Sequence, residues 1–198
     1  MRRRRVVASA VLAIGLAGLA GGCSSNNDNN GPRGSLAITM GATGAPAANA
    51  VETVNADPDE ALAHLTTAII TIAGIEARIA GGAWVPVDTG LPADVELFAI
   101  MNSGSGATLP ADLLPAGDYD ALALRITQLQ LTPRNDADLV IAPPGRGWTV
   151  QIPMNFTVVA GESTDVKLKL RCRSSFRLLD GQFEFDPDIE VESVEHAD

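Results

Sequence analysis

The sequence predicts an all-β fold, a single antiparallel β-sandwich with one short helix. Short runs rich in β-branched and apolar residues recur from residue 34 onward, and Gly, Pro and Asp separate them. Several runs alternate apolar with polar residues, as a strand with one buried face does. Short strands punctuated in this way favour a sandwich over βαβ units. The expected strands cover residues 35–40, 68–79, 83–87, 95–99, 119–131, 147–152, 156–159, 164–173 and 182–192.

Ahead of these strands, residues 1–22 have the pattern of an export signal. Four arginines follow Met1, residues 6–20 are apolar, and two glycines precede Cys23. About 15 apolar residues are too few for a permanent membrane span, which needs about 20, so we expect cleavage. Residues 19–23 resemble the lipobox of bacterial lipoproteins, and this resemblance implies an acylated thiol at Cys23. The alternative is an ordinary secretory signal that happens to contain a cysteine.

Residues 23–33 are expected to form a flexible linker that follows the lipidated cysteine, because they are too polar to bury a core. Residues 34–198 then form the sandwich domain. Loss of residues 1–22 removes four arginines and no acid, which leaves 10 cations, 24 acids and a net charge of −14. Such a charge disfavours nucleic acid as a partner. Ser24 in place of Asp resembles lipoproteins sorted to the outer membrane, so we expect a cell-envelope protein there.

One stretch before the second strand, residues 55–65, has a helical pattern. Asp57 can cap a helix, Pro58 suits its first turn, and Glu60 completes a capping box. The alternative is a calcium loop, because Asn55, Asp57 and Asp59 alternate as in the start of an EF-hand loop. That loop needs Gly at its sixth position and an acid at its twelfth, where Glu60 and Thr66 stand. In the strand that follows, the apolar positions change parity at Gly74, which predicts a β-bulge.

The last 35 residues predict a hairpin with a charged ladder. Apolar residues alternate with cations over residues 166–173, and Asp180-Gly181 is a strong two-residue turn signal. Placing the turn there pairs residues whose numbers add to 361, which matches opposite charges on one face and apolar residues on the other. The charged pairs are Arg177 with Glu184, Arg173 with Asp188, Arg171 with Glu190 and Lys169 with Glu192. The apolar pairs are Leu178 with Phe183, Phe176 with Phe185, Cys172 with Ile189 and Leu170 with Val191. The alternative interpretation is that the cationic face of residues 166–173 forms a binding site for an anion.

The order of these features resembles the bacterial lipoprotein domains grouped as domain of unknown function 4382. The segments that carry the resemblance are residues 34–39, 70–72, 82–85, 95–97, 114–119, 122–126, 159–164, 173–175 and 183–187. The resemblance implies a β-sandwich of immunoglobulin-like or transthyretin-like type and brings no activity with it. The chain departs from the family in an insertion at residues 51–65 and in cations at Lys169 and Arg171, where the family strand usually carries Asp.

The residues that enzymes use are sparse. With two histidines and with Cys23 acylated, Cys172 has no disulfide partner and a Cys/His zinc site cannot be assembled. Residues 102–106 carry serines with the wrong spacing for a nucleophile elbow and are expected to form a flexible loop. Acid pairs that could serve glycoside chemistry are Asp118 with Asp120 and Asp136 with Asp138. We therefore expect no enzyme, cofactor or metal.

The candidate ligand-binding residues are Trp84 and Trp148, which could form a platform for sugars, although each follows a glycine-rich turn where tryptophan is often a core residue. The sequence therefore predicts a membrane-anchored, non-catalytic binding or structural module of the envelope. Its expected partners are the membrane, through the lipid, and an envelope protein or glycan. A carbohydrate-binding or adhesin-like module is the alternative, and an envelope hydrolase is a third.

Overall fold

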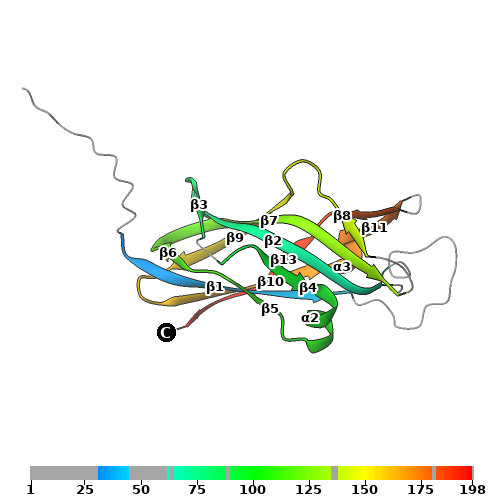
Figure 1. Cartoon of the computed structure of the whole chain (residues 1–198). Coiled ribbons are helices and arrows are strands. Elements are labelled where there is room, and N and C mark those ends of the chain that lie inside the picture. The colour runs from blue at the N-terminus through cyan, green and yellow to red at the C-terminus, as the bar shows by residue number, and fades with distance from the viewer. Residues whose placement is uncertain are drawn as a thin grey trace, which may run out of the picture.

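The computed structural model of the chain describes residues 31–44, 62, 65–87, 90–134, 138–179 and 182–197. The strands in these residues form two β-sheets that pack against each other around one core (Figure 1). The predicted all-β sandwich is confirmed. Cys23, the linker, the acidic Asn55 to Asp59 stretch and the 180–181 turn lie outside the described residues. In the described part of the chain, no helix is long and apolar enough to cross a membrane.

The first sheet, here called sheet 1, is built around the parallel pairing of its two central strands. These strands are β1 (Arg33–Thr43) and β10 (Ser163–Arg171), and their ladder runs from Ser35 opposite Ser163 to Thr43 opposite Arg171. β13 (Ile189–Ala197) pairs with β10, whereas β5 (Ala107–Leu109) and β6 (Leu113–Pro115) pair with β1. The parallel ladder differs from the antiparallel arrangement that we expected. It is feasible because the long connection from β1 to β10 passes through the other sheet.

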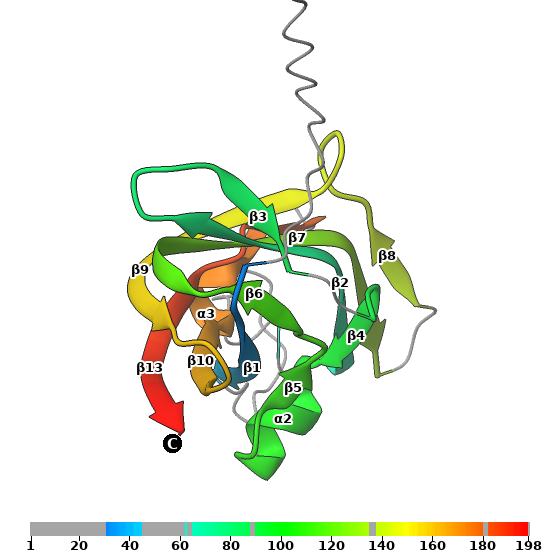
Figure 2. The ribbon, with the colours of Figure 1, turned by 90° about the vertical axis from the view of Figure 1, so that its left-hand side faces the viewer.

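The second sheet, sheet 2, is antiparallel throughout. Its strands are β2 (Leu65–Ile79), β3 (Trp84–Pro86), β4 (Ala93–Glu96), β7 (Gly117–Pro133), β8 (Leu139–Ile141) and β9 (Trp148–Val158). β2 and β7 form the long central pair, with β3 and β4 on the far side of β2 and with β8 and β9 on the far side of β7. Figure 2 shows the two sheets from one end.

The predicted bulge at Gly74 is confirmed. The ladder between β2 and β7 is irregular between Ile72 and Gly74. Before the bulge, Ile70 and Ile72 are buried, and after it Ile75 and Ala77 are buried, so the buried parity changes at the glycine. The bulge keeps both halves of this 15-residue strand packed on the core.

The core lies between the two sheets. Side chains from both sheets are fully buried, and each buried Leu, Ile or Phe contributes about 1.5–3 kcal/mol of transfer free energy. The largest of them are Tyr119, Phe176, Leu36, Ile38, Met40, Leu62, Ile70, Ile72, Leu97, Leu109, Leu114 and Leu122. Of residues 55–65, which we predicted to be helical, the structure describes Leu62, which is helical and buried, and Leu65, which instead begins strand β2.

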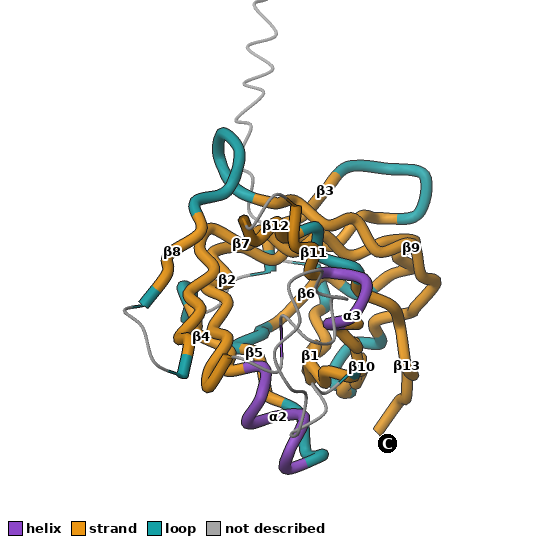
Figure 3. The backbone as a smooth tube through the Cα atoms, turned by 90° about the vertical axis from the view of Figure 1, so that its right-hand side faces the viewer, coloured by secondary structure: helices purple, strands orange, loops and turns teal. Residues whose placement is uncertain are grey.

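Helix α2 (Leu97–Ser103) replaces part of a predicted strand, as Figure 3 shows in purple. The strand expected at residues 95–99 ends at Glu96, whose carboxylate caps the helix by accepting the backbone N–H groups of Phe98 and Ala99. Gly104 ends the helix in the left-handed conformation, at φ 67°. The prediction was wrong because Leu97, Phe98 and Ile100 are buried at helical spacing. The expected loop at 102–106 therefore begins inside α2.

The C-terminal hairpin follows the predicted register only next to its turn. β11 (Phe176–Leu179) and β12 (Gln182–Phe185) pair Arg177 with Glu184 and Phe176 with Phe185, as expected. Between β10 and β11, however, residues 172–175 form the short helix α3 (Cys172–Ser175). Beyond it, Lys169 lies opposite Glu190, so the expected pairing of Lys169 with Glu192 is wrong by two residues.

Side-chain contacts restore much of the predicted charge ladder in spite of this shift. Lys169 Nζ lies 2.5 Å from Glu192, and Arg171 contacts Glu190 at 3.2 Å, in both cases diagonally across the strands. Arg171 also contacts Asp188 at 2.7 Å, the acid that we had assigned to Arg173. A shift of two residues keeps every side chain on its predicted face.

Candidate functional site

The outer face of sheet 2, which points away from the core, carries three rows of side chains defined by strand register. In the first row, Trp84, Arg78, Ala121 and Pro153 lie side by side on β3, β2, β7 and β9. In the second row they are Pro86, Glu76, Ala123 and Gln151. In the third row they are Gly74, Arg125 and Thr149. The small residues in the middle of these rows leave a hollow between larger neighbours.

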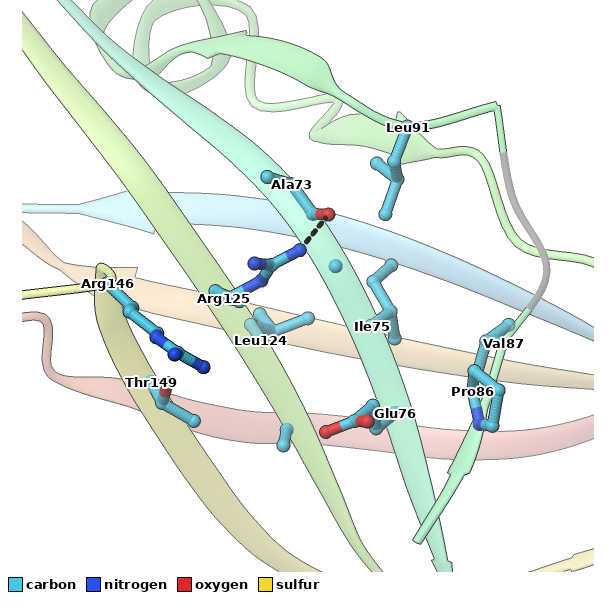
Figure 4. A pocket seen from close by; sticks show the side chains of 12 residues that line it. Ala73, Ile75, Glu76, Pro86, Val87, Leu91, Leu124, Arg125, Arg146 and Thr149 are labelled. Carbon is cyan, nitrogen blue, oxygen red and sulfur yellow. Dashed lines mark hydrogen bonds between the residues drawn. The ribbon is translucent and has the colours of Figure 1, made fainter.

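This hollow is a groove of about 600 Å³, here called the outer-face groove (Figure 4). The small residues Gly74 and Ala123 are among those that line it. Arg125 and Arg146 line one side together with Thr149, and Pro86, Val87 and Leu91 line the other. Glu76 stands at one end. The volume is in the range of small-molecule sites, about 300–1,000 Å³.

Arg125 is held in place by the bulge on β2. One Nη2 hydrogen of its guanidinium is donated to the carbonyl oxygen of Ala73, at 3.0 Å. A Cβ atom at Gly74 would lie 3.2 Å from Arg125 Nε, so the glycine provides the space that the guanidinium occupies. The bulge thus aligns an exposed carbonyl with an arginine from the neighbouring strand.

Arg146 reaches the same groove from the loop that precedes β9. Two glycines flank it, Gly145 at φ 63° and Gly147 at φ 125°, both conformations that favour glycine. A Cβ atom on Gly147 would lie 2.6 Å from the carbonyl oxygen of Ile126 and 3.5 Å from Arg125 Cγ. The absence of a side chain at Gly147 therefore lets the loop lie against β7 and brings Arg146 beside Arg125.

Neither arginine of the groove has an acidic partner within 4 Å in the described part of the chain, although acids outnumber cations 24 to 14 in the sequence. The cations of β10 are paired in contrast, Lys167 with Glu195 at 3.0 Å and Lys169 with Glu192 at 2.5 Å. Two exposed guanidinium groups are thus left free to bind an anion in one groove.

The two predicted tryptophans do not form one platform. Trp84 lies on the outer face, in the first row, and the Arg78 guanidinium stacks over its ring at 5.4 Å. Trp148 belongs to the opposite face of sheet 2, where it packs against the core and meets Phe185 edge to face at 5.1 Å. The two residues also stand on opposite sides of the β2–β7 pair. Whether either indole binds a ligand stays a prediction.

The acids that we considered for catalysis have structural partners. Asp120 accepts a hydrogen bond from Arg78 Nε at 2.5 Å and another from the Gly81 backbone at 3.1 Å, which together lower the pKa of its carboxyl. Asp118 accepts the hydroxyl of Thr157 at 2.8 Å. Asp136 lies outside the described residues. Burial raises the pKa of the Cys172 thiol to about 12, which makes this cysteine a poor nucleophile.

No group of three or more His, Cys, Asp or Glu side chains in the described residues is placed to hold a metal ion. The groove residues Arg125, Arg146 and Glu76 were missed at the sequence level. A usable signal was present, because Arg125 is the one charged residue in the apolar run Leu122 to Ile126 and lies opposite the bulge glycine.

The chain was also compared with known proteins. No curated protein and no solved structure matches it. One family model does, the one described as Domain of unknown function (DUF4382), over residues 57–187. The match begins after β1, so the resemblance that we noted at residues 34–39 lies outside it. Because the matched segment is well over half of the sequence and includes the whole groove, the chain belongs to the DUF4382 family.

Proposed function

We propose that this protein is a lipid-anchored, non-catalytic binding module of the cell envelope, held at the outer membrane through Cys23. The outer-face groove is its ligand site. The observation that carries the proposal is the pair of guanidinium groups, Arg125 and Arg146, that line the groove without an acidic partner in the described residues. Exposed cations that line one groove are a binding feature, because in the described residues a single hydrogen bond, from Arg125 to the Ala73 carbonyl, uses one of their donors and the others point to the groove or to solvent.

The position of the first strand supports the anchor. β1 begins at Arg33, ten residues after Cys23, and a linker of that length would reach roughly 18 Å if it has the random-coil character that the sequence predicts. The start of β1 lies at the end of the sandwich that faces the reader in Figure 2. Gly161 of the β9–β10 turn donates its N–H to the Arg33 carbonyl there, at 2.9 Å. A short tether from this end would keep it close to the bilayer.

The same end of the sandwich carries apolar side chains. Ile79, Leu113 and Val159 are 40–45% exposed, and they are three of the five large hydrophobic residues exposed in the described chain. Leu113 lies opposite Ser35 of β1, and Val159 belongs to the turn whose Gly161 donates to Arg33. Ile79 lies opposite Tyr119, two residues after the start of β7, where Gly117 lies opposite Val158. Apolar groups at this end suit a position against the membrane surface.

The anchor is tested by metabolic labelling of cells with an alkyne analogue of palmitate. The full chain should incorporate the label and sediment with outer-membrane vesicles, whereas Cys23→Ser should do neither. Ser25→Ala is the matched control, because it changes one small residue two positions after the lipidation site and should behave like the unchanged chain. Equal labelling of the unchanged chain and of Cys23→Ser would contradict the anchor.

Carbohydrate binding is the second candidate function, and the position of Trp84 favours it. Trp84 lies on the same outer face as the groove, two rows from Arg125, and Arg78 fixes its ring. An indole beside polar side chains on an open sheet face is suited to stack on a sugar ring. Glycan-array binding that Trp84→Ala abolishes, and that Trp148→Phe leaves intact, would support this candidate.

A further inference from the structure

We propose that the outer-face groove binds a carboxylate carried by a glycan with one acidic sugar among neutral units, and that Arg125 and Arg146 are the carboxylate ligands. The inference rests on the proposed function and names the ligand class of the same groove. It goes beyond a general sugar site because it assigns recognition to the charged group.

The geometry of the arginines favours a carboxylate. A guanidinium presents five N–H donors in a plane, and two parallel donors match the two oxygens of a carboxylate. The hydrogen bond to the Ala73 carbonyl uses one Nη2 hydrogen of Arg125 and fixes the group, so the remaining donors are available. The loop around Gly147 brings Arg146 to the same side of the groove, where both guanidiniums can approach one anion.

The rest of the groove excludes a dense polyanion. Glu76 stands at one end of the groove and is exposed, and the sequence carries a net charge of −10. Like charges raise the free energy of binding for nucleic acid or a polyphosphate. A single carboxylate beside the arginines avoids this repulsion, and neutral hydroxyl groups can donate to Glu76.

The same surface is poorly suited to a peptide strand. At these positions the backbone of β7 is paired on both sides, Ala123 with Glu76 and Gln151, and Arg125 with Gly74 and Thr149. A peptide on this face would find no main-chain partners, and such partners supply the affinity when a strand is added to a sheet. Sugars are bound through side chains, and here Thr149 offers a hydroxyl while Pro86 and Leu91 offer an apolar wall for C–H groups.

The test uses the full chain in detergent and a trisaccharide that ends in glucuronic acid, with binding followed by NMR titration. Its methyl ester is the matched ligand, because it keeps the shape and removes the charge. Arg125→Gln and Arg146→Gln are the test variants. Arg134→Gln, exposed just beyond β7 and outside the groove, is the matched control for the loss of one positive charge.

We expect the ester, Arg125→Gln and Arg146→Gln each to weaken binding about tenfold or more, because each removes a charge-assisted contact, and we expect Arg134→Gln to change it less than about twofold. Melting temperatures establish that the variants are folded. Equal binding of acid and ester, or equal binding by the groove variants and Arg134→Gln, overturns the inference, as does the absence of binding.

A glycan, peptide and metabolite screen separates the two proposals. If another ligand binds and both groove variants lose it, the binding module stands and the acidic-glycan inference fails. If no ligand depends on Arg125 or Arg146, both proposals about the groove fail.

Discussion

Replacing Gly147 with alanine should damage both the fold and the groove, and the structure sets the size of the effect. The new Cβ would lie 2.6 Å from the Ile126 carbonyl oxygen, closer than real Cβ contacts come, and φ there is 125°. Backbone strain of this kind costs about 1–3 kcal/mol. Because strand β7 cannot yield easily, the loop has to move, and we expect Gly147→Ala to lower the free energy of unfolding by about 2–4 kcal/mol.

The same loop contains the matched control. Gly145 also has a positive φ, 63°, but a Cβ there would meet nothing within 4 Å. Gly145→Ala should therefore cost only about 1–2 kcal/mol, the usual price of the left-handed conformation. Urea unfolding, followed by tryptophan fluorescence, measures the stability of both variants. The urea midpoint of Gly147→Ala should be lower than that of Gly145→Ala by about 0.5 M or more. Equal midpoints for the two variants would refute the close packing of the loop against β7, and with it the placement of Arg146.

Three further predictions concern the rest of the sandwich. Cys172 should resist alkylation at pH 8 in the folded protein and react once urea unfolds it, because burial raises the pKa of its thiol to about 12; rapid labelling of the native chain would contradict its position in the core. Asp120→Asn should lower the melting temperature at pH 7, because the carboxylate that Arg78 and Gly81 stabilise is lost. The difference in melting temperature from the unchanged chain should shrink as pH falls below the usual carboxyl pKa of 3.8 and through the lowered pKa of the folded state. A difference that does not change with pH would argue against the ion pair. Cysteines at 169 and 190 should form a disulfide on oxidation in preference to a pair at 171 and 190, which the sequence register had favoured; mass spectrometry of the cross-link decides between the registers.

The strands and the bulge could be predicted because they depend on local alternation. The apolar positions of β2 change parity at Gly74 in the sequence itself, and the ladder is irregular at the same place. A buried face imposes a period of two, so a parity change leaves few explanations other than an inserted residue. Parallel pairing of β1 with β10 leaves no such trace, because residues 128 positions apart meet only in the folded chain.

The register of the hairpin was predicted only in part, for a related reason. Charge and apolar matching detect a slip by one residue, because it puts every side chain on the wrong face. The helical turn at Cys172–Ser175 introduces a shift of two, which preserves the faces and leaves the cations opposite acids. Ser175 stabilises this corner, because its hydroxyl donates to the Arg171 carbonyl at 2.8 Å and accepts the Asp188 N–H at 2.9 Å. These bonds are tertiary, and the alternation pattern contains no signal for them.

The groove was not predicted because separate segments assemble it: the bulge on β2, the end of β3 with the residues that follow it, the centre of β7, and the start of β9 with the loop before it. Sequence reasoning placed weight on tryptophan, the residue most typical of sugar sites, and the structure shows Trp148 packed on the core face. Glycines gave the better indication. Gly74 leaves space for the Arg125 guanidinium, and Gly147 leaves space for the β7 backbone at Ile126. Gly74 lies on β2 and Gly147 immediately before β9, so the two glycines flank Arg125 from either side of β7.

An open groove with a single charged subsite has a consequence for a tethered protein. Arg125 and Arg146 contribute charge-assisted contacts of about 1.5–3 kcal/mol each, and the cost of association offsets much of this gain. We therefore expect one copy to bind one acidic sugar weakly, with a Kd of about a millimolar or higher. Copies anchored in one membrane can engage several acidic sugars of one polymer, and such linkage raises avidity by about 10²–10⁴ without a new contact. Vesicles that carry the acylated chain should therefore retain a polysaccharide in which single uronates are separated by neutral sugars, in a flotation assay at concentrations where the detergent-solubilised chain binds little. Vesicles with Arg125→Gln should lose the polymer, whereas equal retention by those vesicles would show that the polysaccharide is held elsewhere.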